Sequence, residues 1–295
     1  MRLLYIFIMK TSLSHLPKAK KDELKKIVKT LLEFKEVEMV ILFGSYATGK
    51  YVHRDRYVED GIIYEYKSDY DLLIILSQNK QADNPSFIHN ITAKLKELDL
   101  FTPVSPIYEG ASFVNEKLSE GNYFFSDIKK EGILLYDSKR KQLARKRKQN
   151  LEETQRQARD YFDEWFESAE GFLKGFDFYI KEKDYKIAAF LLHQAVERFY
   201  HTVSLVFTGY KHKTHDLEEL GNVASTLNLE YKKIFPRKTR TEEHHFMLLQ
   251  KAYIDSRYKK NYKITQKELE YLAKRVIKLR DLTEKVCKEK IKDFV

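Results

Sequence analysis

The chain has 295 residues, of which 43% are hydrophobic and 33% are charged, and its formal net charge is +10. A chain of this length can bury a sizeable core and predicts two domains, because domains typically contain about 100 to 200 residues. The composition is that of a soluble protein. The single cysteine, Cys287, excludes an internal disulfide and indicates a reducing compartment, for which we expect the cytoplasm.

The beginning of the chain, residues 1–8, contains an apolar run of about six residues. This run predicts no membrane helix and no signal peptide, because a membrane span needs roughly 20 apolar residues. It is interpreted as an upstream extension, with Met9 as an alternative first residue to Met1. Residues 17–34 then predict an amphipathic helix, since their apolar side chains recur on one side.

A short apolar segment, residues 39–43, predicts a buried strand that ends at a Gly44-Ser45 step. Gly44 permits a tight turn, and the backbone N–H groups from Ser45 onward can face an anion. We therefore expect Gly44 and Ser45 to hold the phosphates of a nucleotide.

Two aspartates, Asp69 and Asp71, open a second apolar strand in the sequence SDYDLLIIL. The alternation of a strand places both on one face, with Tyr70 on the other. Two such carboxylates suit a magnesium ion that also contacts substrate phosphates. The pattern predicts phosphoryl or nucleotidyl transfer, with Asp69 and Asp71 as metal ligands and catalytic residues.

Gly44, Ser45, Asp69 and Asp71 match, residue by residue, a strand, Gly-Ser turn, short helix and D-x-D strand. The segment resembles the DNA polymerase beta-like nucleotidyltransferases and is most similar to the minimal nucleotidyltransferases. The alternative is a surface turn followed by a solvated strand start. A D-x-D pattern alone is common, but its combination in this order with the apolar run LLIIL is not, which disfavours this alternative. The resemblance implies a nucleoside triphosphate substrate, ATP foremost, magnesium as cofactor, and a small molecule, an RNA end or a protein as acceptor.

The stretch between the turn and the aspartates is longer than the resemblance implies. Its excess, residues 51–67, predicts a β-hairpin that is rich in Tyr, His and Arg and turns at Glu59-Asp60-Gly61. The hairpin either shapes an acceptor site or is a decorative insertion.

A third carboxylate, which the resemblance implies on the next strand, is missing from its expected position. That strand, residues 102–108, carries Ser105 and Pro106 at its centre. Asp99 and Glu109 flank it, and either substitutes only if the register differs from this interpretation. The loss weakens the prediction of turnover more than that of nucleotide binding.

The rest of the first domain predicts helices in residues 87–98 and 112–132 and a last strand in residues 133–136. The first domain, residues 10–138, is thus expected to be a small mixed sheet covered by helices on one side. A basic segment follows in residues 139–154, in which seven of the ten residues 139–148 are Lys or Arg. It marks a domain boundary and can attract phosphates, although lysine-rich helix faces are often simply solvated.

The second half predicts helices almost throughout, so the fold class is α+β with an all-α second domain. Long helices are expected in residues 151–174 and 185–207, and the capping box from Thr265 to Glu268 opens the last one. Residues 188–198, 213–220 and 252–265 resemble the HEPN family of helical domains. The HEPN-like domain is assigned to residues 155–290, and the resemblance implies a homodimer through this domain.

Ribonucleases of the HEPN family use an Arg followed a few residues later by a His. Here Arg257 corresponds to that arginine, but Tyr262 stands where the histidine is expected. A separate match, Arg240 and His245, lies earlier and is interpreted as coincidence. Ribonuclease activity is therefore the weaker hypothesis for Arg257 and Tyr262.

Three polar residues, His193, Glu197 and His201, share one face of an expected helix. Their spacing is compatible with a metal ion, but their neighbours are apolar. A hydrogen-bonded polar strip within the bundle, or one facing the other domain, is the favoured interpretation.

The leading hypothesis is an enzyme that binds a nucleoside triphosphate and magnesium and transfers a nucleotidyl group. The HEPN-like domain would close the cleft and help to select the acceptor. The alternatives are a catalytically impaired nucleotide-binding module of toxin–antitoxin type and a HEPN ribonuclease. No membrane partner is expected.

Overall fold

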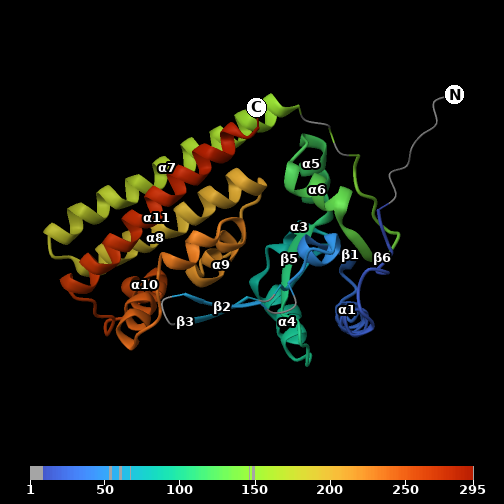
Figure 1. Ribbon diagram of the computed structural model, residues 1–295, viewed down its shortest axis with the longest axis horizontal. Helices are drawn as coiled ribbons and strands as arrows, with labels where there is room; N and C mark the ends of the chain where they lie inside the picture. The colour runs from blue at the N-terminus through green and yellow to red at the C-terminus, as the bar shows by residue number, and fades with distance from the viewer. Residues whose placement is uncertain are drawn as a thin grey trace. The chain divides into compact units, whose positions relative to one another are not determined.

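The computed structural model describes residues 9–52, 55–59, 62–66, 68–145, 147 and 150–294. The chain divides into two compact units, residues 1–148 and 149–295. The first unit contains a mixed sheet with helices, and the described residues of the second contain helices and no strand, which confirms the predicted fold class (Figure 1).

The first unit is built on a four-stranded sheet with the strand order β5-β4-β1-β6. Strand β1 (Val37–Phe43) pairs antiparallel with β4 (Tyr70–Leu76) and with β6 (Ile133–Asp137). Strand β4 pairs parallel with β5 (Val104–Gly110). The strand that ends at Gly44 and the strand that carries Asp71 are therefore direct neighbours.

Helices cover both faces of this sheet, so the expectation of a single covered face was wrong. Val40, Leu42, Leu72 and Ile74 form a core with α1 and α4. The alternate residues, such as Ile41, Leu73 and Ile75, are equally buried, and α5 and α6 contact β4 and β1. The helices of this unit are α1 (Lys18–Leu31), α2 (Gly44–Thr48), α3 (Asn79–Ala82), α4 (Pro85–Lys96), α5 (Ala111–Glu120) and α6 (Tyr123–Glu131).

The insertion between the turn and the aspartates forms an antiparallel ribbon of β2 (Asp55–Glu59) and β3 (Ile62–Tyr66). Its register pairs Glu59 with Ile62. The turn residues Asp60 and Gly61, and the side chains of the predicted Tyr, His and Arg residues from 53 to 67, lie outside the described residues.

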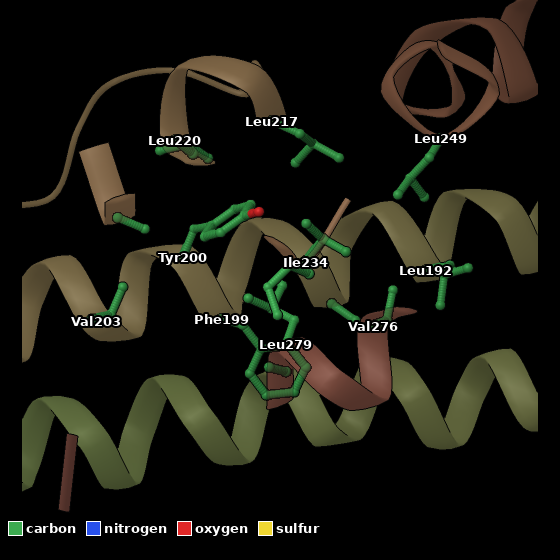
Figure 2. Packing of buried hydrophobic residues seen from close by; sticks show 14 of the residues in the cluster. Leu192, Phe199, Tyr200, Val203, Leu217, Leu220, Ile234, Leu249, Val276 and Leu279 are labelled. Atoms are coloured by element: carbon green, nitrogen blue, oxygen red, sulfur yellow. The ribbon is translucent and has the colours of Figure 1, made fainter. Parts of the chain in front are cut away.

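In the second unit, α8 is the central helix, because α7, α9, α10 and α11 all contact it. Helices α7, α8 and α11 run along one another (Figure 1). Leu192, Phe199 and Val203 project from α8 toward side chains of the surrounding helices, among them Leu249, Val276 and Leu279 (Figure 2). The elements are α7 (Leu151–Lys181), α8 (Tyr185–Thr208), α9 (Leu217–Leu227), the 3-10 helix η1 (Leu229–Lys233), α10 (Arg240–Tyr258) and α11 (Gln266–Lys292).

Local sequence explains where these helices begin and end. Asn150 and Thr265 each accept a hydrogen bond from a backbone N–H group of the first turn and complete a capping box with a Glu three residues later. Gly209 ends α8 with a φ of 70°, a conformation that side chains other than glycine rarely adopt. No helix in the described part of the chain is both long and apolar enough to span a membrane.

The start of the basic segment is attached to the first unit. Lys139 pairs with Asp137, and Arg140 donates hydrogen bonds to the Glu38 carboxylate at 3.1 Å and to the Lys35 carbonyl at 2.8 Å. The division between the two compact units falls after residue 148, within this segment.

Candidate functional site

The Gly-Ser turn connects β1 directly to the short helix α2. Gly44 has a φ of 69°, which gives the chain a sharp change of direction at the end of the strand. The carbonyl of Gly44 accepts a hydrogen bond from the Thr48 hydroxyl at 3.1 Å, within the same turn. The first N–H groups of a helix have no partner within it, so this turn is suited to an anionic ligand.

The strand register brings Asp71 against this turn. Asp71 of β4 lies opposite Phe43 of β1, the residue before Gly44. A Cβ atom at Gly44 would lie 2.0 Å from Oδ2 of Asp71, far inside any allowed contact. Glycine is therefore required at this position for two reasons, its positive φ and the approach of the carboxylate.

The two aspartates differ in their surroundings. Asp71 is half-buried, and burial together with the negative charge of Asp69 raises the pKa of Asp71 to about 8. Asp69 accepts a hydrogen bond from the Ser105 hydroxyl on Oδ2. Tyr70, between them, is fully buried on the opposite face. Two carboxylates that repel each other beside a phosphate-type turn are well suited to a divalent cation.

The position of a third acid is occupied by Ser105. In the parallel pairing of β4 and β5, Ser105 lies beside Asp71 and Pro106 lies beside Leu72. Glu109 lies beside Ile75 and is buried, whereas Asp99 is exposed and precedes the strand. Within the described ranges, no set of three or more His, Cys, Asp or Glu side chains is arranged to hold a metal ion. The donor set is thus two carboxylates, which fits a magnesium ion whose other ligands are phosphate and water oxygens.

The insertion begins and ends next to these residues. Val52 and Ser68 close its base with two hydrogen bonds, from Val52 N to Ser68 Oγ at 2.9 Å and from Ser68 N to Val52 O at 3.0 Å. Tyr51 stacks on Tyr46 of α2 with ring centroids 4.3 Å apart. The base of the ribbon is therefore fixed one residue before Asp69.

Arg257 and Tyr262 have different environments in the second unit. Arg257 is exposed in the last turn of α10, and its guanidinium lies over the rings of Phe190, Tyr253 and Tyr258. Tyr262 is buried, its hydroxyl donates to the Leu248 carbonyl at 3.0 Å, and burial raises the pKa of its hydroxyl. Tyr262 therefore serves the packing of the unit.

The two residues of the earlier Arg-His match, Arg240 and His245, both belong to α10. Arg240 is the first residue of α10. The His245 ring packs on Tyr271 of α11 with centroids 4.5 Å apart. This contact is consistent with a packing role for His245.

Glu197 of α8 is the centre of a polar cluster. It accepts hydrogen bonds from Gln194 at 3.1 Å and from Nδ1 of His215 at 3.0 Å. His193 and His201 flank it with nitrogen–oxygen distances of 3.9 Å and 3.8 Å, and burial is the main cause that lowers the pKa of each to about 3. Both histidines are neutral at pH 7, so this is a polar strip within the unit.

Two contacts of these sites were missed from the sequence. The bond from Ser105 to Asp69 and the bond from His215 to Glu197 join segments that are distant along the chain. His215 lies in the segment of residues 213–220 that resembles the HEPN family, next to Asp216, which caps α9. The periodicity of neighbouring residues carries no signal for either contact.

Comparison with known protein families gives two matches. The family model described as Polymerase beta, Nucleotidyltransferase matches residues 25–141, and the model described as HEPN domain matches residues 162–286. No curated protein matches the chain. The matches confirm the two resemblances and their order along the chain.

Proposed function

Because the chain combines a polymerase beta-type nucleotidyltransferase domain with a HEPN domain, we propose that its first unit binds a nucleoside triphosphate with magnesium and transfers the nucleotidyl group. The approach of Asp71 to Gly44 carries this proposal, since it puts a metal-type carboxylate directly beside a phosphate-type turn. Gly44 and Ser45 would contact the phosphates, and Asp69 and Asp71 would hold the magnesium ion. ATP is the first substrate to test.

The roles of the side chains follow from their positions. Bound magnesium would neutralise charge on the phosphates of the triphosphate. Ser105 fixes one oxygen of Asp69, while Phe43 and Gly44 fix the position of Asp71. The acceptor oxygen forms a bond to the α-phosphorus, the bond between that phosphorus and the bridging oxygen of the β-phosphate breaks, and pyrophosphate leaves. The proton of the acceptor hydroxyl passes to solvent.

The test is incubation with α-labelled ATP and magnesium, with candidate acceptors of the three classes and with the protein itself. We expect label transfer and pyrophosphate release with the wild type, and loss of both in Asp69→Ala/Asp71→Ala. Asp99→Asn is the matched control, because Asp99 is an exposed acid of the same unit. Absence of ATP binding by the wild type would overturn the proposal.

A second candidate is a nucleotide-binding regulatory module, of toxin–antitoxin type, that does not turn over. Ser105 favours it, because a hydroxyl stands beside Asp71 where a third acid would assist the acceptor. Tight binding of ATP by the wild type without pyrophosphate release would support this module and contradict the transferase.

Ribonuclease activity has less support. Tyr262 is buried and bonded to a backbone carbonyl, so it offers no acid or base beside Arg257. RNA cleavage that Arg257→Ala abolishes and that Asp71→Ala leaves unchanged would favour this third candidate.

A homodimer through the HEPN domain and a cytoplasmic location are further parts of the proposal. A light-scattering mass of twice the 35.2 kDa of one chain would support the dimer, and a mass of 35.2 kDa would contradict it.

A further inference from the structure

Three neighbouring strand positions decide how many metal ions the first unit can hold. The register aligns Phe43, Asp71 and Ser105 across β1, β4 and β5. We infer that this unit binds one divalent cation together with a nucleoside triphosphate, not two, and that the hydroxyl at Ser105 sets this number. The inference rests on the proposed function and deepens it.

The first argument is the supply of charged oxygen ligands. Two ions about 3.5–4 Å apart need anionic ligands that bridge them or bind each of them. Asp69 and Asp71 are two carboxylates, and one oxygen of Asp69 already accepts the Ser105 hydrogen bond. With water and phosphate oxygens, the remaining carboxylate oxygens complete one magnesium coordination sphere of six oxygens.

The second argument is that no other acid of the neighbouring strand reaches this place. Glu109 lies on the same face of β5 as Ser105 but beside Ile75, at the opposite end of the paired segment, and it is buried. Asp99 precedes β5 and is exposed. The Ser105 hydroxyl is neutral and donates its hydrogen bond to Asp69, so it does not replace a carboxylate.

The third argument is where the single ion would bind. Oδ2 of Asp71 lies on the turn side, close to Gly44. Asp71 would hold the ion through this oxygen, beside the turn that would hold the phosphates. A second ion would have to lie toward β5, on the side of Ser105, where Asp69 is already hydrogen-bonded to Ser105 and the described residues of β5 provide no further carboxylate.

The consequence concerns the acceptor. A single ion held by Asp69 and Asp71 would supply charge stabilisation for the departing pyrophosphate, and this unit would offer the attacking hydroxyl no second ion to lower its pKa. The acceptor must then lose its proton to solvent, or be acidic enough to ionise near pH 7. We expect slow transfer to alkyl alcohols and faster transfer to more acidic hydroxyl groups.

The experiment counts manganese ions by electron paramagnetic resonance, with α,β-methylene-ATP as the non-reacting nucleotide. The wild type should bind one Mn²⁺ per nucleotide and chain, with the uncoupled six-line spectrum of a single ion. Ser105→Asp places a carboxylate on the strand beside Asp71, with strands about 4.8 Å apart, and should bind a second Mn²⁺ with a spin-coupled spectrum.

Matched variants separate the charge from the hydrogen bond. Ser105→Asn is similar in size to Ser105→Asp but neutral, so it should keep one ion. Ser105→Ala removes the bond to Asp69 and should keep one ion with about tenfold weaker affinity. Circular dichroism spectra of each variant test whether it is folded.

The outcomes distinguish the two levels of the proposal. Two coupled Mn²⁺ ions in the wild type would overturn the single-ion inference and leave the proposed function intact. A folded Ser105→Asp variant that still binds one ion would also contradict the role of Ser105. No protein-bound Mn²⁺ in the presence of the nucleotide would contradict the proposed function itself.

Discussion

Replacement of Gly44 by alanine tests the closest contact of the candidate site. A residue other than glycine at a φ of 69° costs about 1–2 kcal/mol of stability. In addition, the new Cβ would lie 2.0 Å from Oδ2 of Asp71, and this oxygen must move by about 1.4 Å to reach the 3.4 Å of an ordinary contact. A displacement of about 1 Å at a reacting centre can reduce a rate about 100-fold.

Gly49→Ala is a well-matched control for this change. Gly49 ends the same short helix with a φ of 78°, but a Cβ there meets only the His15 ring, at an ordinary 3.6 Å. Both variants should therefore lose the free energy of unfolding that the positive φ costs, measured by urea titration with circular dichroism, and Gly44→Ala should lose more because its Cβ also displaces Asp71. Only Gly44→Ala should also lose magnesium-dependent ATP affinity, by at least about tenfold in calorimetry, because it displaces the carboxylate that would hold the metal ion. Equal ATP affinities of the two variants would refute the assignment of this turn and Asp71 to one site.

Three further predictions address single groups. The pKa of Asp71 is raised to about 8, so the folded protein favours the protonated carboxyl group. The stability of the metal-free protein should therefore fall as pH rises from about 4 to 8. In urea titrations at pH 8, Asp71→Asn should be more stable than the wild type. A difference in free energy of unfolding between the wild type and Asp71→Asn that does not change with pH would contradict this prediction. Tyr262→Phe removes the hydrogen bond to the Leu248 carbonyl and should lower the free energy of unfolding by about 1 kcal/mol without affecting ATP binding. Cys287 is fully buried and burial raises the pKa of its thiol, so it should react with a thiol reagent only after the helical unit opens; rapid labelling of the native protein would show the packing to be wrong.

The sequence was sufficient for features that depend on neighbours along the chain. A glycine after an apolar strand, alternating aspartates and capping boxes are local patterns. The family matches confirm the nucleotidyltransferase resemblance drawn from the first two and the HEPN resemblance drawn from residues 188–198, 213–220 and 252–265. Contacts that depend on register were out of reach. Nothing near Gly44 in the sequence reveals that the Asp71 carboxylate occupies the space where a Cβ of residue 44 would lie, and nothing near Ser105 reveals its bond to Asp69.

The covering of the sheet is a different case, because a signal was present. The strand sequence LLIIL is apolar without alternation, which is typical of strands that are buried on both faces. Leu72 and Leu73 are adjacent, point to opposite faces, and are both buried. The prediction of one covered face failed because it took no account of this uninterrupted apolar run.

The pair of hydrogen bonds between Val52 and Ser68 has a consequence for how this domain can change. Val52 and Ser68 are hydrogen-bonded to each other, so the two ends of the inserted segment lie side by side at its base. Such a segment can be lengthened, shortened or exchanged with little effect on the strands beneath it, since loop closure costs little extra free energy as a loop grows. New binding properties can thus be attached one residue from Asp69 while the geometry of Gly44, Asp71 and Ser105 stays the same.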